Sequence, residues 1–96
     1  MYIISIIYTA PLEFIDAMLD EHIAFLDKYY AQGTFLASGR KEPRTGGVIL
    51  ATATYPEELE VIMQEDPFVQ QNASVYEITQ FIPTKTAPAL KALEEL

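Results

Sequence analysis

The segment PLEFIDAMLDEHIAFLDKYYAQ, residues 11–32, has the hydrophobic periodicity of one long amphipathic helix. At about 100° per residue its apolar side chains form one broad face, and most of its acidic side chains lie opposite. His22 is the only histidine of the chain and falls near the middle of the apolar face. Pro11 suits the first turn, and Gly33 suits a left-handed stop. We therefore expect a titratable side chain on the buried side of this helix.

Four segments rich in β-branched and aromatic residues predict the strands of a sheet around this helix. The first, Tyr2 to Tyr8, is apolar except for Ser5, so we expect both of its faces to be buried. The other three are expected over residues 34–38, 48–54 and 75–83.

A second helix is expected between the third and fourth strands. Thr54 to Glu57 has the pattern of a capping box at its start. Asp66 continues the apolar face of this helix, and the residue before a proline avoids helical geometry, so the helix should end at Asp66-Pro67. The terminal residues 84–96 are expected to form a helix or arm.

The resulting order, βαββαβ, predicts one α+β domain over residues 1–96, a ferredoxin-like sandwich. Its antiparallel four-stranded sheet would carry both helices on one face. An apolar sheet face without helices implies an interface. A homodimer that stacks two such sheets would cover it.

The composition argues against several classes of function. Fourteen acidic and six basic residues give a net charge of −8, which would repel nucleic acids and anionic membrane surfaces. No apolar run approaches the roughly 20 residues of a membrane span, and no signal peptide is recognisable, so we expect a cytoplasmic protein. The absence of cysteine and the single histidine argue against a classical metal site, and no cofactor is implied.

His22 and Asp66 are the candidate catalytic residues. In a ferredoxin-like sandwich the first helix lies beside the end of the second, so the two side chains can approach each other near the sheet. A carboxylate fixes the tautomer of a neighbouring imidazole and supports its protonated form, as a general acid or base requires. The alternative is a core histidine bonded to a backbone carbonyl and an ordinary Asp-Pro helix cap. Spacing alone favours this alternative.

Polar groups that could hold a ligand follow the second strand. Ser38 offers a hydroxyl, and Gly39 permits close approach of the backbone. Arg40 and Arg44 belong to a local basic cluster, and a guanidinium binds a carboxylate through two parallel hydrogen bonds. On sequence alone an ordinary strand-ending turn is favoured for Ser38 and Gly39. A solvated charged loop is at least as compatible with Arg40 and Arg44.

Three motifs, taken together, resemble the YciI-like proteins. They are EHIAFL at residues 21–26, Ser-Gly at 38–39 followed by EPRTGG at 42–47, and Asp-Pro-Phe at 66–68. The resemblance runs from the first strand to the fourth. It implies a ferredoxin-like fold that dimerises by sheet stacking into a dimeric α/β barrel, as in muconolactone isomerases and small monooxygenases.

The resemblance also implies a histidine and aspartate pair as the active site, which corresponds to His22 and Asp66 here. Spacing alone favours a core histidine, whereas the resemblance favours an active-site histidine. We expect a small cofactor-independent enzyme of lyase or isomerase type that moves a proton on a small cyclic, anionic substrate, with Ser38 and Arg44 helping to hold it. Two alternatives stay open: a non-catalytic dimeric ligand-binding or sensory module, and a monooxygenase of the same barrel architecture.

Overall fold

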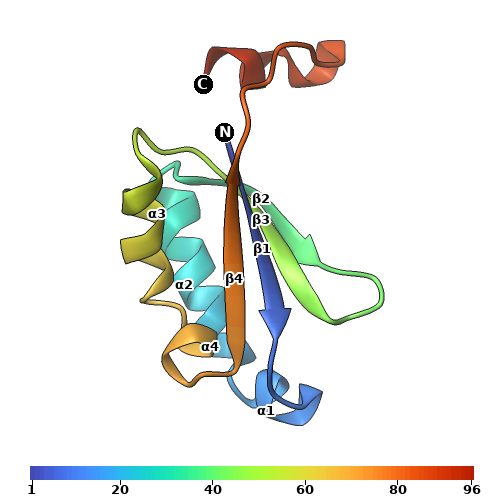
Figure 1. Ribbon diagram of the computed structural model, residues 1–96, viewed down its shortest axis with the longest axis vertical. Coiled ribbons are helices and arrows are strands. Elements are labelled where there is room, and N and C mark those ends of the chain that lie inside the picture. Colours follow the sequence, from blue (N-terminus) through green and yellow to red (C-terminus); the bar gives the residue numbers. More distant parts are fainter.

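The computed structural model describes all 96 residues, and its main elements follow the expected order (Figure 1). None of its helices is long and apolar enough to cross a membrane. The elements are β1 (Tyr2–Tyr8), α1 (Leu12–Ala17), α2 (Leu19–Ala31), β2 (Phe35–Arg40), β3 (Gly46–Ala51), α3 (Pro56–Met63), α4 (Pro67–Gln70), β4 (Ser74–Gln80) and the 3-10 helix η1 (Pro88–Glu95).

The four strands form one antiparallel sheet in the order β2-β3-β1-β4. The central strand β1 pairs with β3 on one side and β4 on the other, so that Ile4 lies opposite both Ile49 and Ile78. Two interleaved βαβ crossovers produce this order. The predicted ferredoxin-like α+β sandwich is confirmed.

The main core lies between the sheet and the helices α2 and α3, which cover the same face of the sheet (Figure 1). Alternate residues of β1 point into it, as the period of a strand requires. The core residues are Tyr2, Ile4, Ile6, Phe25, Tyr29, Phe35, Ile49, Ala51, Leu59 and Met63.

The opposite face of the sheet, which we call the open face, is not covered by any element of the chain (Figure 1). On this face Ile7 of β1 is 43% exposed, and its partner Val75 of β4 is 54% exposed. Within the single chain β1 is therefore buried on its helix side only. The prediction that both faces of this strand are buried is wrong for the chain alone, because both helices pack on one side.

The predicted long first helix is two helices, α1 and α2, separated at Met18. This residue has φ −106° and ψ 5°, so it leaves helical geometry. The break lets the two helices meet different apolar groups. Ile15 of α1 packs with Phe68 and Ala73, whereas Phe25 of α2 packs in the main core. A straight helix has one continuous apolar stripe and could not reach both.

The start of α3 also differs from the prediction. Tyr55 is the N-cap residue and makes no side-chain cap bond, so the capping box of Thr54 and Glu57 is wrong. The helix instead begins at Pro56, since proline suits the first helical position, and this moves the start by one residue. The Thr54 amide donates to the carboxylate of Glu58 at 3.3 Å.

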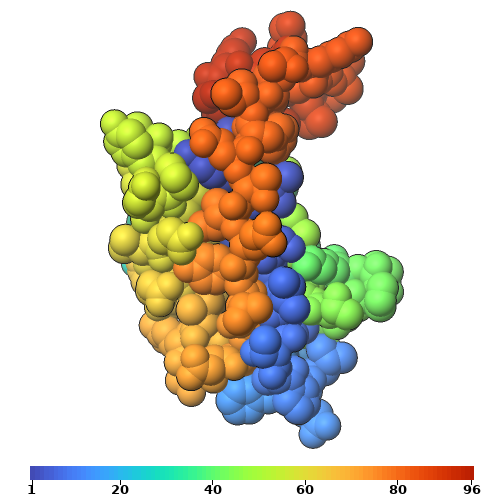
Figure 2. Space-filling model, viewed as in Figure 1, coloured from blue at the N-terminus to red at the C-terminus, as the bar shows by residue number.

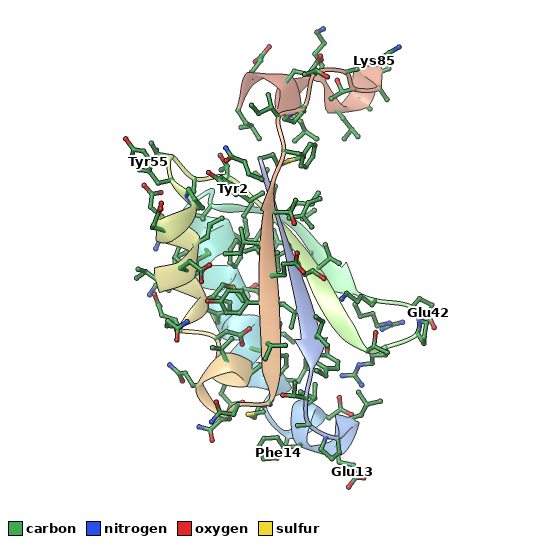
Figure 3. The ribbon with its side chains drawn as sticks, in the orientation of Figure 1. Tyr2, Glu13, Phe14, Glu42, Tyr55 and Lys85 are labelled. Carbon is green, nitrogen blue, oxygen red and sulfur yellow. The ribbon has the colours of Figure 1, made fainter.

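Strand β2 extends two residues beyond the predicted end. Gly39 pairs with Val48 and Arg40 pairs with Gly47, so both residues belong to the sheet and not to the loop. A ladder is made of backbone hydrogen bonds, and therefore it can continue through glycine and arginine, which side-chain preference disfavours. Figure 3 shows Glu42 at the tip of the shorter loop that remains, pointing away from the body.

Strand β4 ends at Gln80, and the chain then leaves the sheet. The Phe81 amide donates to the Met1 carbonyl at 2.9 Å, and the Met1 ammonium donates to the Phe81 carbonyl at 3.0 Å. No residue after Phe81 bonds to β1 through its backbone. The prediction had continued this strand to Pro83, which has no N–H to donate. The terminal residues stand away from the body (Figure 2), with η1 near the end.

Candidate active site

Asp66 connects the end of α3 to the short helix α4. Its backbone is extended, and its side chain is completely buried. Oδ1 accepts a hydrogen bond from the Phe68 amide at 3.0 Å, which caps α4 as the sequence predicted.

The same oxygen lies 2.9 Å from Nδ1 of His22, which α2 carries. From the sequence, Asp66 could be either a helix cap or the partner of a histidine. In the structure one oxygen of its carboxylate, Oδ1, has both roles. The other oxygen, Oδ2, is buried without a partner.

Phe68 fixes the plane of the imidazole. The rings of His22 and Phe68 are stacked, with their centroids 4.1 Å apart and their planes 12° apart. The tripeptide Asp66-Pro67-Phe68 thus supplies the carboxylate oxygen, the turn and the stacking ring for one histidine.

The hydrogen bond to Asp66 determines which edge of His22 is free. A carboxylate only accepts hydrogen bonds, so Nδ1 carries the proton that is shared with Oδ1. Nε2 has no hydrogen-bond partner in the chain, and it is not completely buried. In the neutral imidazole Nε2 is a proton acceptor, and in the charged form it is a donor.

A pocket of about 420 Å³ lies between α2 and the strands β1, β2 and β3, and His22 lines it. The His22 side chain is 12% exposed, while Asp66 lies behind it and is sealed from solvent. Much of the wall is apolar, as is usual for a small-molecule site. The apolar lining includes Ile6, Leu19, Ile23, Leu26, Ile49 and Phe68.

The four residues that the sequence suggested for ligand binding all line this pocket. They are Ser38, Gly39, Arg40 and Arg44. Ser38 reaches the pocket because it pairs with Ile49, whose side chain belongs to the core face, and the continuation of β2 adds Gly39 and Arg40.

Two polar side chains of the pocket, Ser38 and Arg44, have side-chain partners. The Ser38 hydroxyl lies 2.6 Å from the hydroxyl of Tyr30, and Arg44 Nη2 donates to Asp16 Oδ1 at 2.6 Å. This bond holds the pKa of the Asp16 carboxyl below its ordinary value and raises the pKa of the Arg44 guanidinium. Arg40 makes no ion pair. No three acidic or histidine side chains converge in a group that could hold a metal ion.

Two further side chains, Tyr8 and Asp16, also line the pocket. From sequence, a tyrosine such as Tyr8 could either line a pocket or fill a core, and its ring meets Phe68 edge-on at 5.9 Å. Sequence reasoning missed Asp16, because its partner Arg44 lies in a separate part of the chain and no local pattern joins the two.

These features define a class of small ferredoxin-like α+β domain in which a histidine, backed by a buried aspartate, lines an apolar pocket. A family model described as the YCII-related domain matches residues 1–82, and the chain belongs to this family. The terminal residues that stand away from the body lie outside the match.

A solved structure shares the fold. It is the 5-chloro-2-hydroxyhydroquinone dehydrochlorinase (TftG) of Burkholderia phenoliruptrix in complex with 2,5-dihydroxybenzoquinone. The TM-score is 0.70 at 16% sequence identity, and the match covers 84% of this chain and 93% of that one. At this identity the similarity concerns the fold. No curated protein matches the chain.

Proposed function

We propose that this protein is a small enzyme of lyase or isomerase type that transfers a proton on a small cyclic organic ligand, without a cofactor. One observation carries the proposal. Nδ1 of His22 is 2.9 Å from the buried Asp66, which leaves Nε2 as the free ring nitrogen of a histidine that lines the pocket. A positioned imidazole of this kind typically contributes 10²- to 10⁴-fold to a rate, as an order of magnitude.

In the proposed step Nε2 takes a proton from a carbon or hydroxyl group of the ligand. The bond to hydrogen breaks, its electron pair stays on the ligand, and His22 becomes an imidazolium beside Asp66. The electron pair then expels a leaving group, as in a lyase, or is protonated at another atom by Nε2, as in an isomerase. Asp66 orients the ring and stabilises its positive charge throughout.

Ser38 and the two arginines hold the ligand in this proposal. A ring fits the apolar wall, and an anionic or hydroxyl substituent fits Ser38, Arg40 and Arg44. The similar dehydrochlorinase is named for a reaction on a chlorinated hydroxyhydroquinone. That compound is therefore a reasonable first test compound.

The proposal includes a homodimer in which the open faces of two sheets stack. Ile7 and Val75 on this face are about half exposed in the single chain. Burying such side chains is favourable by about 25 cal/mol per Å² of apolar surface, and apolar side chains exposed on one sheet face suit a two-fold interface.

The test compares the natural protein with His22→Gln. Glutamine can still donate a hydrogen bond to Asp66, but it cannot transfer a proton near neutral pH. Both proteins are incubated in D₂O with 5-chloro-2-hydroxyhydroquinone and with a panel of cyclic enols. Chloride release and deuterium incorporation are followed by NMR.

We expect at least one compound to react or exchange with the natural protein, and no enzyme-dependent reaction with His22→Gln at an unchanged melting temperature. Equal rates in the two proteins would refute the proposal. Ligand binding by both, with no reaction in either, would instead support a binding module. Consumption of oxygen would indicate a monooxygenase.

A further inference from the structure

Three charged side chains of the pocket, Asp16, Arg40 and Arg44, are partly or largely exposed, and we call the region that they line the pocket mouth. Of the two arginines only Arg44 has an acidic partner, at 2.6 Å. The nearby acids Glu13 and Glu42 point outward and do not line the pocket (Figure 3). Deeper in the pocket His22 is already paired with Asp66. The mouth therefore holds one uncompensated positive charge, on Arg40.

Because of this arrangement, the two arginines contribute differently to the affinity for an anionic ligand. A ligand carboxylate at Arg40 gains a new charge-assisted hydrogen bond. At Arg44 it must replace the carboxylate of Asp16, which exchanges one ion pair for another. The net charge of −8 adds a general repulsion that grows with the negative charge of the ligand.

We propose that Asp16 is a specificity-determining residue: by occupying Arg44 it leaves Arg40 as the single free cation, so that the pocket selects cyclic ligands with one negative charge over ligands with two or with none. This inference rests on the proposed function to the extent that the pocket binds a small organic ligand. It does not require that His22 catalyses a reaction.

Three probes of one ring size test it: benzoate with one charge, phthalate with two, and benzamide with none. His22 is the only histidine, so its ring protons give isolated NMR signals inside the pocket. Titrations at pH 8 and constant ionic strength follow these signals and yield a Kd for each probe. In the natural protein we expect benzoate to bind more tightly than phthalate and benzamide.

The decisive variant is Asp16→Asn, which frees Arg44. The ratio of the phthalate Kd to the benzoate Kd should fall by a factor on the order of 1.5 to 5, the usual range for an exposed charge pair. Asp27→Asn is the matched control, because it removes an exposed acid of α2 that does not line the pocket. It should leave the ratio unchanged.

A double variant isolates the proposed cause. Asp16→Asn combined with Arg44→Gln again leaves one free cation at the mouth, so the preference of the natural protein should return. Arg40→Gln should weaken benzoate binding to the level of benzamide.

The inference is overturned by an unchanged ratio in Asp16→Asn, by a double variant that keeps the altered ratio, or by a natural protein that binds none of the probes at millimolar concentration. The catalytic proposal fails separately. A protein with the expected charge preference but no His22-dependent chemistry would keep this inference and lose that proposal.

Discussion

The rings of His22 and Phe68 lie nearly parallel, with centroids 4.1 Å apart. Stacking on Phe68 fixes the plane of the imidazole, and the hydrogen bond to Asp66 fixes the position of Nδ1. Phe68 is 1% exposed and contributes to a second small core with Ile15 and Ala73. The same ring thus packs the fold and orients the candidate catalytic group.

Phe68→Leu should separate these two effects. Loss of part of a buried aromatic ring is expected to lower the free energy of unfolding by roughly 1–2 kcal/mol. The His22 ring protons should move downfield in the NMR spectrum, because the shielding by the stacked ring is lost. A spectrum unchanged at these protons would contradict the stacked geometry.

Asp66→Asn should keep the fold and reduce the reaction. The asparagine oxygen can still cap α4, since asparagine is a good N-cap residue, but it no longer offers a charge to the imidazolium. We expect turnover to fall by about a hundredfold or more, with little change in urea unfolding.

Asp66→Ala is the structural control for that variant. It also removes the cap of α4, which should cost about 1 kcal/mol of stability. If Asp66→Asn lost as much stability as Asp66→Ala and retained full turnover, the aspartate would be purely a structural cap.

Gly46→Ala should disrupt the junction of β3 with the central strand. A Cβ atom at Gly46 would lie 1.8 Å from the carbonyl oxygen of Ile6, which is backbone and cannot move alone. We expect a loss of 3 kcal/mol or more, as an order of magnitude for a severe steric clash, or an insoluble protein. Gly39→Ala is the matched control, because nothing lies within 4 Å of its added Cβ. Similar unfolding curves for the two variants would contradict the predicted clash.

Stability should decline at alkaline pH because of Tyr29. Burial, followed by the hydrogen bond to Glu65, raises the pKa of its hydroxyl above the ordinary value. The folded state therefore holds this proton more tightly than the unfolded chain does. The stabilisation is complete below the unfolded pKa of about 10 and is lost as the pH rises through the folded pKa.

Urea unfolding between pH 8 and pH 11 tests this expectation. Tyr29→Phe should flatten the alkaline decline, although a part should persist because burial also raises the pKa of Tyr76. An identical decline in the natural protein and the variant would contradict it.

The open face of the sheet should control the oligomeric state. Val75→Lys places a charge on the open face, within the proposed interface, and should convert a dimer into a monomer in light scattering at micromolar concentration. Val61→Lys is the control, since Val61 is an equally apolar residue on the helix side and is 69% exposed. A natural protein that is already monomeric would exclude sheet stacking.

Most of the fold could be predicted from sequence because the strands and helices carry strong periodic patterns. β1 matched its predicted bounds, and the order of the main elements was correct. The break at Met18 could not be predicted, because it results from packing α1 and α2 on different apolar groups, and the hydrophobic period continues through it. The capping box failed because Pro56 set the start of α3.

The candidate site was predictable in its residues and less so in its geometry. His22 stood out as a polar residue on an apolar face, and Asp66 as an acid before a proline. One oxygen of Asp66 bonds to both His22 and the Phe68 amide. This shared contact depends on tertiary structure, so local sequence patterns do not indicate it. The pairing of Asp16 with Arg44 joins residues from separate elements, and no local pattern indicates it.

The shared oxygen of Asp66 also links local unfolding to the state of the site. The Phe68 amide can exchange its hydrogen with solvent only when its bond to Oδ1 opens, and opening of that turn also releases His22 from its partner. The exchange rate of this single amide would therefore report how often the site comes apart in solution, without any ligand or substrate.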